Sequence, residues 1–139
     1  MEMNRTCKDG CSYYDGFGCT KSPINAEANM TMREYQKLAA RTMREDLTKE
    51  DTISHALCGM MSELGELAAL HQKEYQGHVF DREHAMIELG DICWFISEYA
   101  SAMGWSLGDV TMLNIDKLRA RYPEGFDTEH SLHRKANDI

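Results

Sequence analysis

Prolines and long apolar runs are what this sequence lacks most clearly. Only two prolines occur among its 139 residues, Pro23 and Pro123. The stretch between them is free of the strongest helix breaker, which favours an all-α fold. No run approaches the ~18 apolar residues that a membrane span needs, and residues 1–10 are too polar for a secretory signal. We therefore expect a cytoplasmic protein that does not associate with membranes.

Positive charge is also in short supply. The chain has 15 lysines and arginines against 23 aspartates and glutamates, which gives a formal net charge of −8. Such a surface repels a phosphate backbone and argues against nucleic-acid binding. An acidic protein still binds phosphates when a divalent cation lies between the two, so some of these carboxylates are candidate metal ligands.

The five cysteines do not form an even set. An odd count without a secretory signal argues against a disulfide framework. Cys7, Cys11 and Cys19 lie close together in the sequence and offer ligands for Zn²⁺. A structural zinc site needs four ligands, so free thiols are the favoured interpretation. Cys58 and Cys93 lie in apolar helical stretches, and we expect them to be buried core thiols.

Composition divides the chain into three parts. Residues 1–29 carry glycines and three of the cysteines without a helical period, which predicts a loop-rich N-terminal extension. Residues 30–128 are expected to form one all-α domain, a four-helix, bundle-like arrangement. Residues 129–139 are predicted to be a polar C-terminal tail.

Four helices are predicted from capping residues and apolar periodicity. The first begins near Thr31, which is spaced with Glu34 as a capping box, and ends before residue 44. The second follows Asp51 as N-cap and runs to about residue 76, where Gly77 is a suitable stop. The third covers about residues 81–103, and the fourth runs from Ser106 to residue 121.

The second and third predicted helices carry matching acidic pairs. Glu63 and Glu66 are three residues apart, as are Glu88 and Asp91, and a glycine precedes the second acid of each pair. Acids at this spacing repel each other on one helix face. Both pairs also border apolar residues, where a carboxylate is costly to desolvate without a compensating charge.

Antiparallel pairing of these helices would bring the four acids together. The two pairs lie at equal distances along the chain on either side of Gly77, the predicted turn. Four carboxylates at one level of a helical hairpin would destabilise it unless a cation joined them. An all-oxygen set selects hard ions, Mg²⁺ above all, with Mn²⁺ or Ca²⁺ as substitutes. The sequence therefore predicts a metal site that acts on phosphates.

The two acidic motifs resemble the hallmark of the MazG-like all-α nucleoside triphosphate pyrophosphohydrolase superfamily, Glu-x-x-Glu followed by Glu-x-x-Asp. On the fourth predicted helix, Asn114, Lys117 and the run Arg121-Tyr122-Pro123 are also similar to that family. The resemblance spans about residues 30–128 and includes the opening helix, with Tyr35-Gln36-x-x-Ala39.

The resemblance implies an activity and a set of site residues. It implies Mg²⁺-dependent hydrolysis of a nucleoside or deoxynucleoside triphosphate to the monophosphate and pyrophosphate, with a metal-bound water attacking the α-phosphorus. The assembly implied is a homodimer or homotetramer whose active sites are completed across subunits. The metal ligands and catalytic carboxylates would be Glu63, Glu66, Glu88 and Asp91, and the substrate-binding residues Asn114, Lys117, Arg121 and Tyr122.

Other interpretations remain open. A di-iron carboxylate bundle needs Glu-x-x-His, and here the residues in the histidine position are Glu66 and Asp91. A phosphoribosyl-ATP pyrophosphatase would share the fold and chemistry, and a catalytically silent binding or assembly module would share the fold alone. A base could stack on aromatic side chains, although aromatics at helical spacing are more often core residues. The candidates are Tyr35, Trp94, Phe95 and Trp105.

Overall fold

The computed structural model describes residues 30–133, apart from the side chain of His130. The prediction of a loop-rich extension with a cysteine cluster at Cys7, Cys11 and Cys19 therefore lies outside the described residues.

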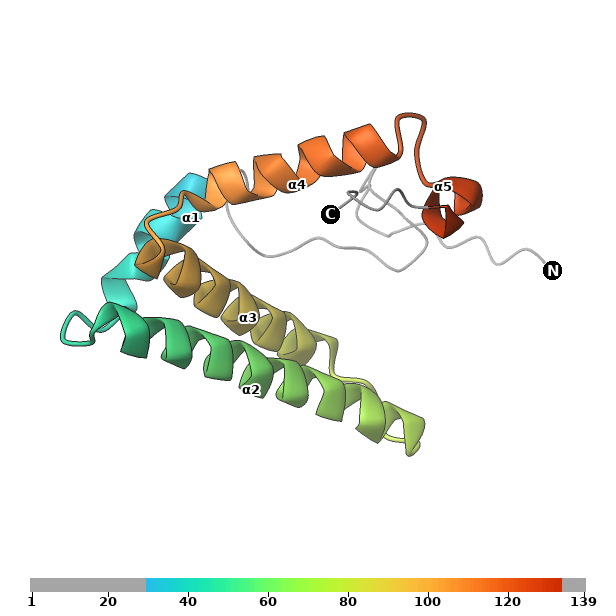
Figure 1. Ribbon diagram of the computed structural model, residues 1–139. Coiled ribbons are helices and arrows are strands. Elements are labelled where there is room, and N and C mark those ends of the chain that lie inside the picture. The colour runs from blue at the N-terminus through green and yellow to red at the C-terminus, as the bar shows by residue number, and fades with distance from the viewer. Residues whose placement is uncertain (1–29, 134–139) are drawn as a thin grey trace, which may run out of the picture. The chain divides into compact units, whose positions relative to one another are not determined.

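The described part of the chain is entirely helical, with no β-strand between residues 30 and 133. This confirms the predicted all-α class. No helix in that range is both long enough and apolar enough to cross a membrane. The elements, drawn in Figure 1, are α1 (Met32–Ala39), the 3-10 turn η2 (Ala40–Thr42), α2 (Lys49–Tyr75), α3 (Arg82–Ala102), α4 (Leu107–Arg121) and α5 (Thr128–Leu132).

Polar side chains fix the starts of the helices. At α1, the Glu34 backbone N–H donates to Thr31 Oγ1 at 3.2 Å, and the Thr31 N–H donates to Glu34 Oε2 at 2.7 Å. This reciprocal pair is the predicted capping box. Asp81 caps α3 and Ser106 caps α4, and these are the residues at which the two helices are predicted to begin.

Two predictions at helix ends differ from the structure. The predicted N-cap of α2, Asp51, is wrong, because Thr48 caps the helix three residues earlier. Asp51 lies inside the first turn, donates its backbone N–H to Thr48 Oγ1 at 3.1 Å and accepts the Thr48 hydroxyl at 2.7 Å. The short helix α5 lies largely in the segment predicted to be a polar tail.

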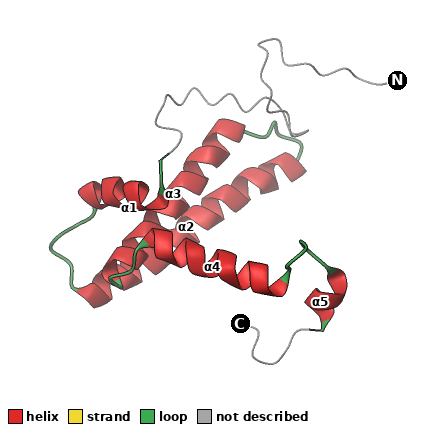
Figure 2. Cartoon of the chain, turned by 90° about the horizontal axis from the view of Figure 1, so that it is seen from above, coloured by secondary structure: helices red, strands yellow, loops and turns green. Residues whose placement is uncertain are grey.

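The helices α2 and α3 form an antiparallel hairpin and lie side by side in both ribbon views (Figures 1 and 2). Gly77 makes the turn with a φ of 94°, a left-handed conformation that favours glycine. Near the other end of the hairpin, Gly59 of α2 lets Phe95 of α3 approach the α2 backbone. A Cβ placed at Gly59 would meet the Phe95 ring at 2.2 Å.

The helix α1 packs against α3 and the start of α4 through one glutamine. Gln36 donates to the Trp105 carbonyl at 2.9 Å and to Ser101 Oγ at 3.0 Å, and its own oxygen accepts the Leu107 N–H at 2.7 Å. Arg33 of α1 forms an ion pair with Asp109 of α4. These contacts anchor the first turn of α4.

The apolar core of the described residues is small. Its buried members are Ala39, Ala56, Leu70, Ala100 and Leu107. The prediction that Cys58 and Cys93 are core thiols is wrong, because both side chains are exposed. Helical periodicity identifies apolar side chains, but in this hairpin each helix covers only part of the other's apolar face.

Candidate metal centre

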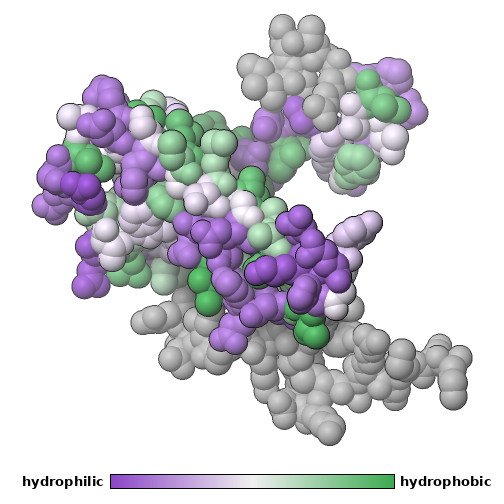
Figure 3. Space-filling model, turned by 90° about the horizontal axis from the view of Figure 1, so that it is seen from below, coloured by the Kyte–Doolittle hydropathy of each residue, from purple (hydrophilic) through white to green (hydrophobic). Residues whose placement is uncertain are grey.

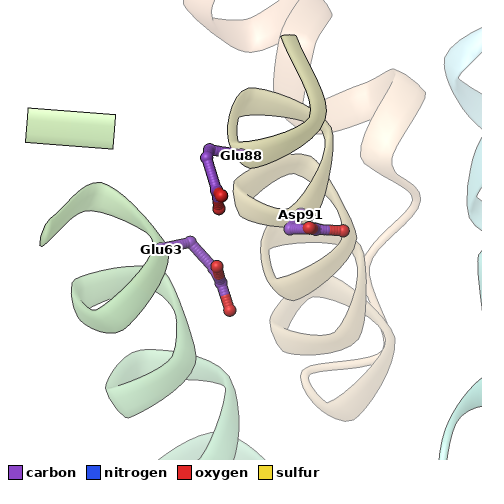
Figure 4. A group of neighbouring side chains, drawn as sticks. All are labelled: Glu63, Glu88 and Asp91. Carbon is purple, nitrogen blue, oxygen red and sulfur yellow. The ribbon is translucent and has the colours of Figure 1, made fainter. Parts of the chain in front are cut away.

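The α2–α3 hairpin brings three of the four predicted acids together. Glu63 comes from α2, and Glu88 and Asp91 come from successive turns of α3. One carboxylate oxygen from each lies within 4.8 Å of the other two. Figure 4 shows the Glu63 and Glu88 side chains both entering the space between the two helices. The symmetry of the two motifs about Gly77 thus corresponds to a real juxtaposition.

The fourth acid, Glu66, is close to the cluster but outside it. Its side chain is exposed, and it does not belong to the group of converging oxygens. Its charge nevertheless contributes to the raised pKa of Glu63. The structure therefore brings together three of the four predicted ligands, and Glu66 lies next to them.

The cluster is electrostatically strained. Desolvation of the Glu63 carboxyl, its hydrogen bond with Glu88, and the charges of Glu66 and Asp91 all raise the pKa of Glu63 above its ordinary value. Glu88 itself is only 5% exposed. Carboxylates held this close favour either a shared proton or a bound cation.

The dimensions suit a small hard cation. Mg²⁺ binds oxygens at ~2.0–2.1 Å in octahedral geometry, so adjacent ligands are ~3 Å apart and opposite ones ~4 Å apart. The observed limit of 4.8 Å between ligand oxygens lies within a small side-chain rotation of those separations. An all-carboxylate donor set has the chemistry that Mg²⁺ and Mn²⁺ prefer.

One histidine and one tyrosine border the cluster. His84 Nε2 lies 2.6 Å from Glu88 Oε1, one helical turn away on α3. The Tyr35 hydroxyl donates to the Gly90 carbonyl at 3.4 Å. Burial raises the pKa of Tyr35 above its ordinary value, and the nearby Cys93 and Asp91 raise it further.

The other aromatic candidates for a base pocket take part in packing. The Trp94 indole N–H donates to Thr42 Oγ1 at 2.8 Å, which ties α3 to η2. Phe95 fills the space over Gly59. Trp105 is half exposed and lies against Tyr99 with ring centroids 6.2 Å apart. These contacts favour the core interpretation for Trp94 and Phe95.

The predicted phosphate-binding residues on α4 are not joined to the cluster. The side chains of Asn114 and Lys117 are exposed and make no hydrogen bond or ion pair with the described residues. Arg121 and Tyr122 are half-buried at the end of α4, with the guanidinium carbon 6.0 Å from the Tyr122 ring centre. The helix α4 contacts α1 and α3 near its start, and Figure 1 shows it diverging from the hairpin.

Two polar contacts of the hairpin were not predicted from the sequence. One is the pairing of His84 with Glu88, and the other is the burial of Glu98 against His55 at 2.8 Å. The i,i+4 spacing of His84 and Glu88 is a visible signal for the first. For the second, the signal is that Glu98 and His55 lie at nearly equal distances from Gly77.

The two glycines that precede the second acids have open space beside them. A Cβ at Gly65 or Gly90 would meet no atom within 4 Å. Within this chain, therefore, neither glycine is required for close helix packing. The backbone at both positions is accessible next to the acidic cluster.

Comparisons with known proteins assign the chain to no family. No model of a known protein family matches the chain, and no solved structure matches it. The chain is similar to the "Gene 37 protein" of Mycobacterium phage L5, with 28% identity over 85 residues. That alignment covers 58% of this chain and 75% of the phage protein, whose name describes no activity.

Proposed function

We propose that this protein is a Mg²⁺-dependent nucleoside triphosphate pyrophosphohydrolase of the MazG-like all-α type. The observation that carries the proposal is that one carboxylate oxygen from each of Glu63, Glu88 and Asp91, on two helices, lies within 4.8 Å of the other two. The motif resemblance supplies the reaction class, since the cluster alone would fit other metal-dependent phosphoryl chemistry.

The carboxylates have distinct tasks in this proposal. Glu63 and Asp91 hold the ion together with Glu88, while the more exposed Glu66 completes its surroundings on the solvent side. When bound, Mg²⁺ neutralises phosphate charge and lowers the pKa of coordinated water. We assign Tyr35, whose hydroxyl donates to the Gly90 carbonyl, the task of limiting water access from the α1 side.

A second copy of the chain would complete the site. Lys117 and Asn114 are suited to bind phosphates, because a cation and an amide donor on one helix face neutralise and orient phosphate oxygens. In one chain they are remote from the carboxylates. We propose a homodimer or a tetramer of dimers in which α4 of one copy reaches the hairpin of another.

Uncovered apolar side chains support the proposed assembly. On α4, the exposed large apolar residues are Met112, Leu113, Ile115 and Leu118. Figure 3 shows apolar side chains at the surface among polar ones on the face seen from below. Apolar area of this kind on helices with a small shared core is typical of protein–protein contact surfaces.

The test is a panel of nucleoside and deoxynucleoside triphosphates, assayed with Mg²⁺ and with EDTA for pyrophosphate and orthophosphate separately. The proposal predicts metal-dependent pyrophosphate release. Glu63→Gln should reduce that release by more than the ~10–100-fold that loss of an outer-shell partner costs. Glu74→Gln, an exposed change on the same helix, should leave the rate unchanged.

Three results would redirect the proposal. Orthophosphate as the product would contradict attack at the α-phosphorus. Release confined to phosphoribosyl-ATP would favour a phosphoribosyl-ATP pyrophosphatase. Mg²⁺ binding without turnover of any triphosphate in the panel would favour a silent binding or assembly module.

A further inference from the structure

The helix α3 carries two buried glutamates, and each is paired with a histidine. Glu98 is 1% exposed and is paired with His55 of α2. Glu88 is 5% exposed and is paired with His84 of its own helix. Only Glu88 belongs to the acidic cluster, so its histidine is the one that bears on a bound ion.

The contact with His84 occupies one of the two Glu88 oxygens. A ring nitrogen and a carboxylate oxygen 2.6 Å apart need a proton between them, because two lone pairs at that distance repel. One carboxylate oxygen of Glu88 also belongs to the converging group, and its side chain enters the space between the two helices beside Glu63 (Figure 4). His84 on one side and Glu63 on the other therefore fix the rotation of this carboxylate.

The number of carboxylate oxygens available distinguishes two common cations. Mg²⁺ is held at ~2.0–2.1 Å in strict octahedral geometry by few protein oxygens and several waters. Ca²⁺ accepts 6–8 oxygens at ~2.3–2.6 Å and commonly takes both oxygens of one carboxylate. A glutamate with one oxygen already engaged suits the first ion better than the second.

We propose that His84 is a positioning residue that limits Glu88 to single-oxygen coordination and thereby makes the cluster favour Mg²⁺ over Ca²⁺. The inference rests on the proposed metal site and adds its ion selectivity. It assigns His84 no contact with the substrate or with the ion.

The test is calorimetric titration of the full chain with Mg²⁺ and, separately, with Ca²⁺. His84→Ala should weaken Mg²⁺ binding ~10–100-fold, the usual effect of losing a partner that orients a metal ligand. Ca²⁺ binding should fall much less, so the ratio of the two affinities should fall ~10-fold or more. His84→Gln, whose amide N–H occupies the position of Nε2, should restore most of that ratio.

The matched control is His133→Ala. His133 Nε2 lies 3.3 Å from Glu129 at the same four-residue spacing, on the exposed helix end of α5 and away from the cluster. That variant should bind both ions as the unmodified protein does. Because His84 is half exposed, His84→Ala should fold, which a thermal melt in EDTA verifies.

The titrations test the proposed metal site and the role of His84 separately. If the unmodified protein binds no Mg²⁺, the proposed function fails. If it binds Mg²⁺ and His84→Ala leaves the affinity ratio unchanged, the role of His84 is overturned while the proposed function stands. Equal weakening of both ions would also overturn it, because a merely structural role predicts that result.

Discussion

The Nδ1 atom of His55 lies 2.8 Å from Oε2 of Glu98, whose side chain is buried where α3 packs on α2. The pair joins the two helices of the hairpin, 43 residues apart in sequence. His55 also makes edge contacts with the rings of Trp94 and Phe95, at centroid distances of 6.5 and 5.5 Å. Because the pair belongs to a packed cluster, its role is to hold the hairpin together.

His55→Ala should therefore destabilise the fold. Removing the hydrogen-bond partner of a buried polar group costs ~1–3 kcal/mol, because that group is then left without a partner away from water. The measurement is urea unfolding in EDTA. Mg²⁺ binding by the folded fraction should be retained, and an undiminished free energy of unfolding would show that water replaces His55 at no cost.

Gly59→Ala should destabilise the hairpin by overpacking. The added methyl would meet the Phe95 ring at 2.2 Å, so the ring or the helix must shift. Overpacking of this kind typically costs ~1–3 kcal/mol. Chemical denaturation of the single variant and of Gly59→Ala with Phe95→Leu checks the cause, since the smaller side chain should recover part of the loss. If the double variant loses as much unfolding free energy as the two single variants together, the contact with Phe95 is not the cause of the destabilisation.

Much of the local structure was predictable because its determinants are local. The capping box at Thr31 and the caps Asp81 and Ser106 depend on a few adjacent residues. The cap at Thr48 was missed because Asp51 is an equally suitable capping residue, and nothing in the sequence ranks the two. Symmetry about Gly77 predicted the hairpin register, because a short turn leaves little freedom to slide.

The site was predictable in part. Matching acidic pairs indicated which level of the hairpin would carry the carboxylates, but spacing alone did not show that Glu66 lies outside the converging group. Burial was the least predictable property. Cys58 and Cys93 were expected inside and are exposed, whereas Glu98 is buried, because the outcome depends on how two helix faces meet.

Mg²⁺ should stabilise the metal-free protein against heat, because an ion that binds only the folded state adds ~2.7 kcal/mol at 100 times its Kd. Asp91→Asn should abolish this gain, since Asp91 belongs to the converging group. Glu66→Gln should retain most of it, because that side chain lies outside the group. Thermal melts with and without Mg²⁺ measure both. If both variants lose the Mg²⁺-dependent stabilisation equally, Glu66 is also a ligand.

Glu63 should give the metal-free protein a distinctive pH dependence. Its pKa is higher in the folded state than its ordinary value of 4.5, so the folded state binds this proton more tightly than the unfolded state does. The resulting stabilisation is greatest below the ordinary value and is lost as the pH rises through the raised one.

The measurement is urea unfolding in EDTA across the acid-to-neutral range, compared with Glu63→Gln. The difference between the two proteins isolates this group from exposed acids such as Glu34, whose pKa is lowered by its hydrogen bonds to Thr31. Parallel pH profiles for the two proteins would contradict the prediction. Bound Mg²⁺ should reverse the trend, because protonation then competes with the ion.

Leu113→Glu should weaken the proposed self-association. Leu113 is 72% exposed on α4, so a charge there costs a single chain little but would be buried between copies. Sedimentation velocity should show the unmodified protein as a dimer or tetramer and the variant shifted toward monomer, with unchanged helix content by circular dichroism. A monomeric unmodified protein would contradict the prediction outright.

The turn at the tip of the α2–α3 hairpin lies far from the acidic cluster. Glu63 precedes the end of α2 at Tyr75 by 12 residues, which is ~18 Å at 1.5 Å per residue. Tyr75 and Val79 are almost wholly exposed there. A fluorescent label attached at Tyr75 or Val79 would therefore leave the carboxylates of the proposed metal site unaltered.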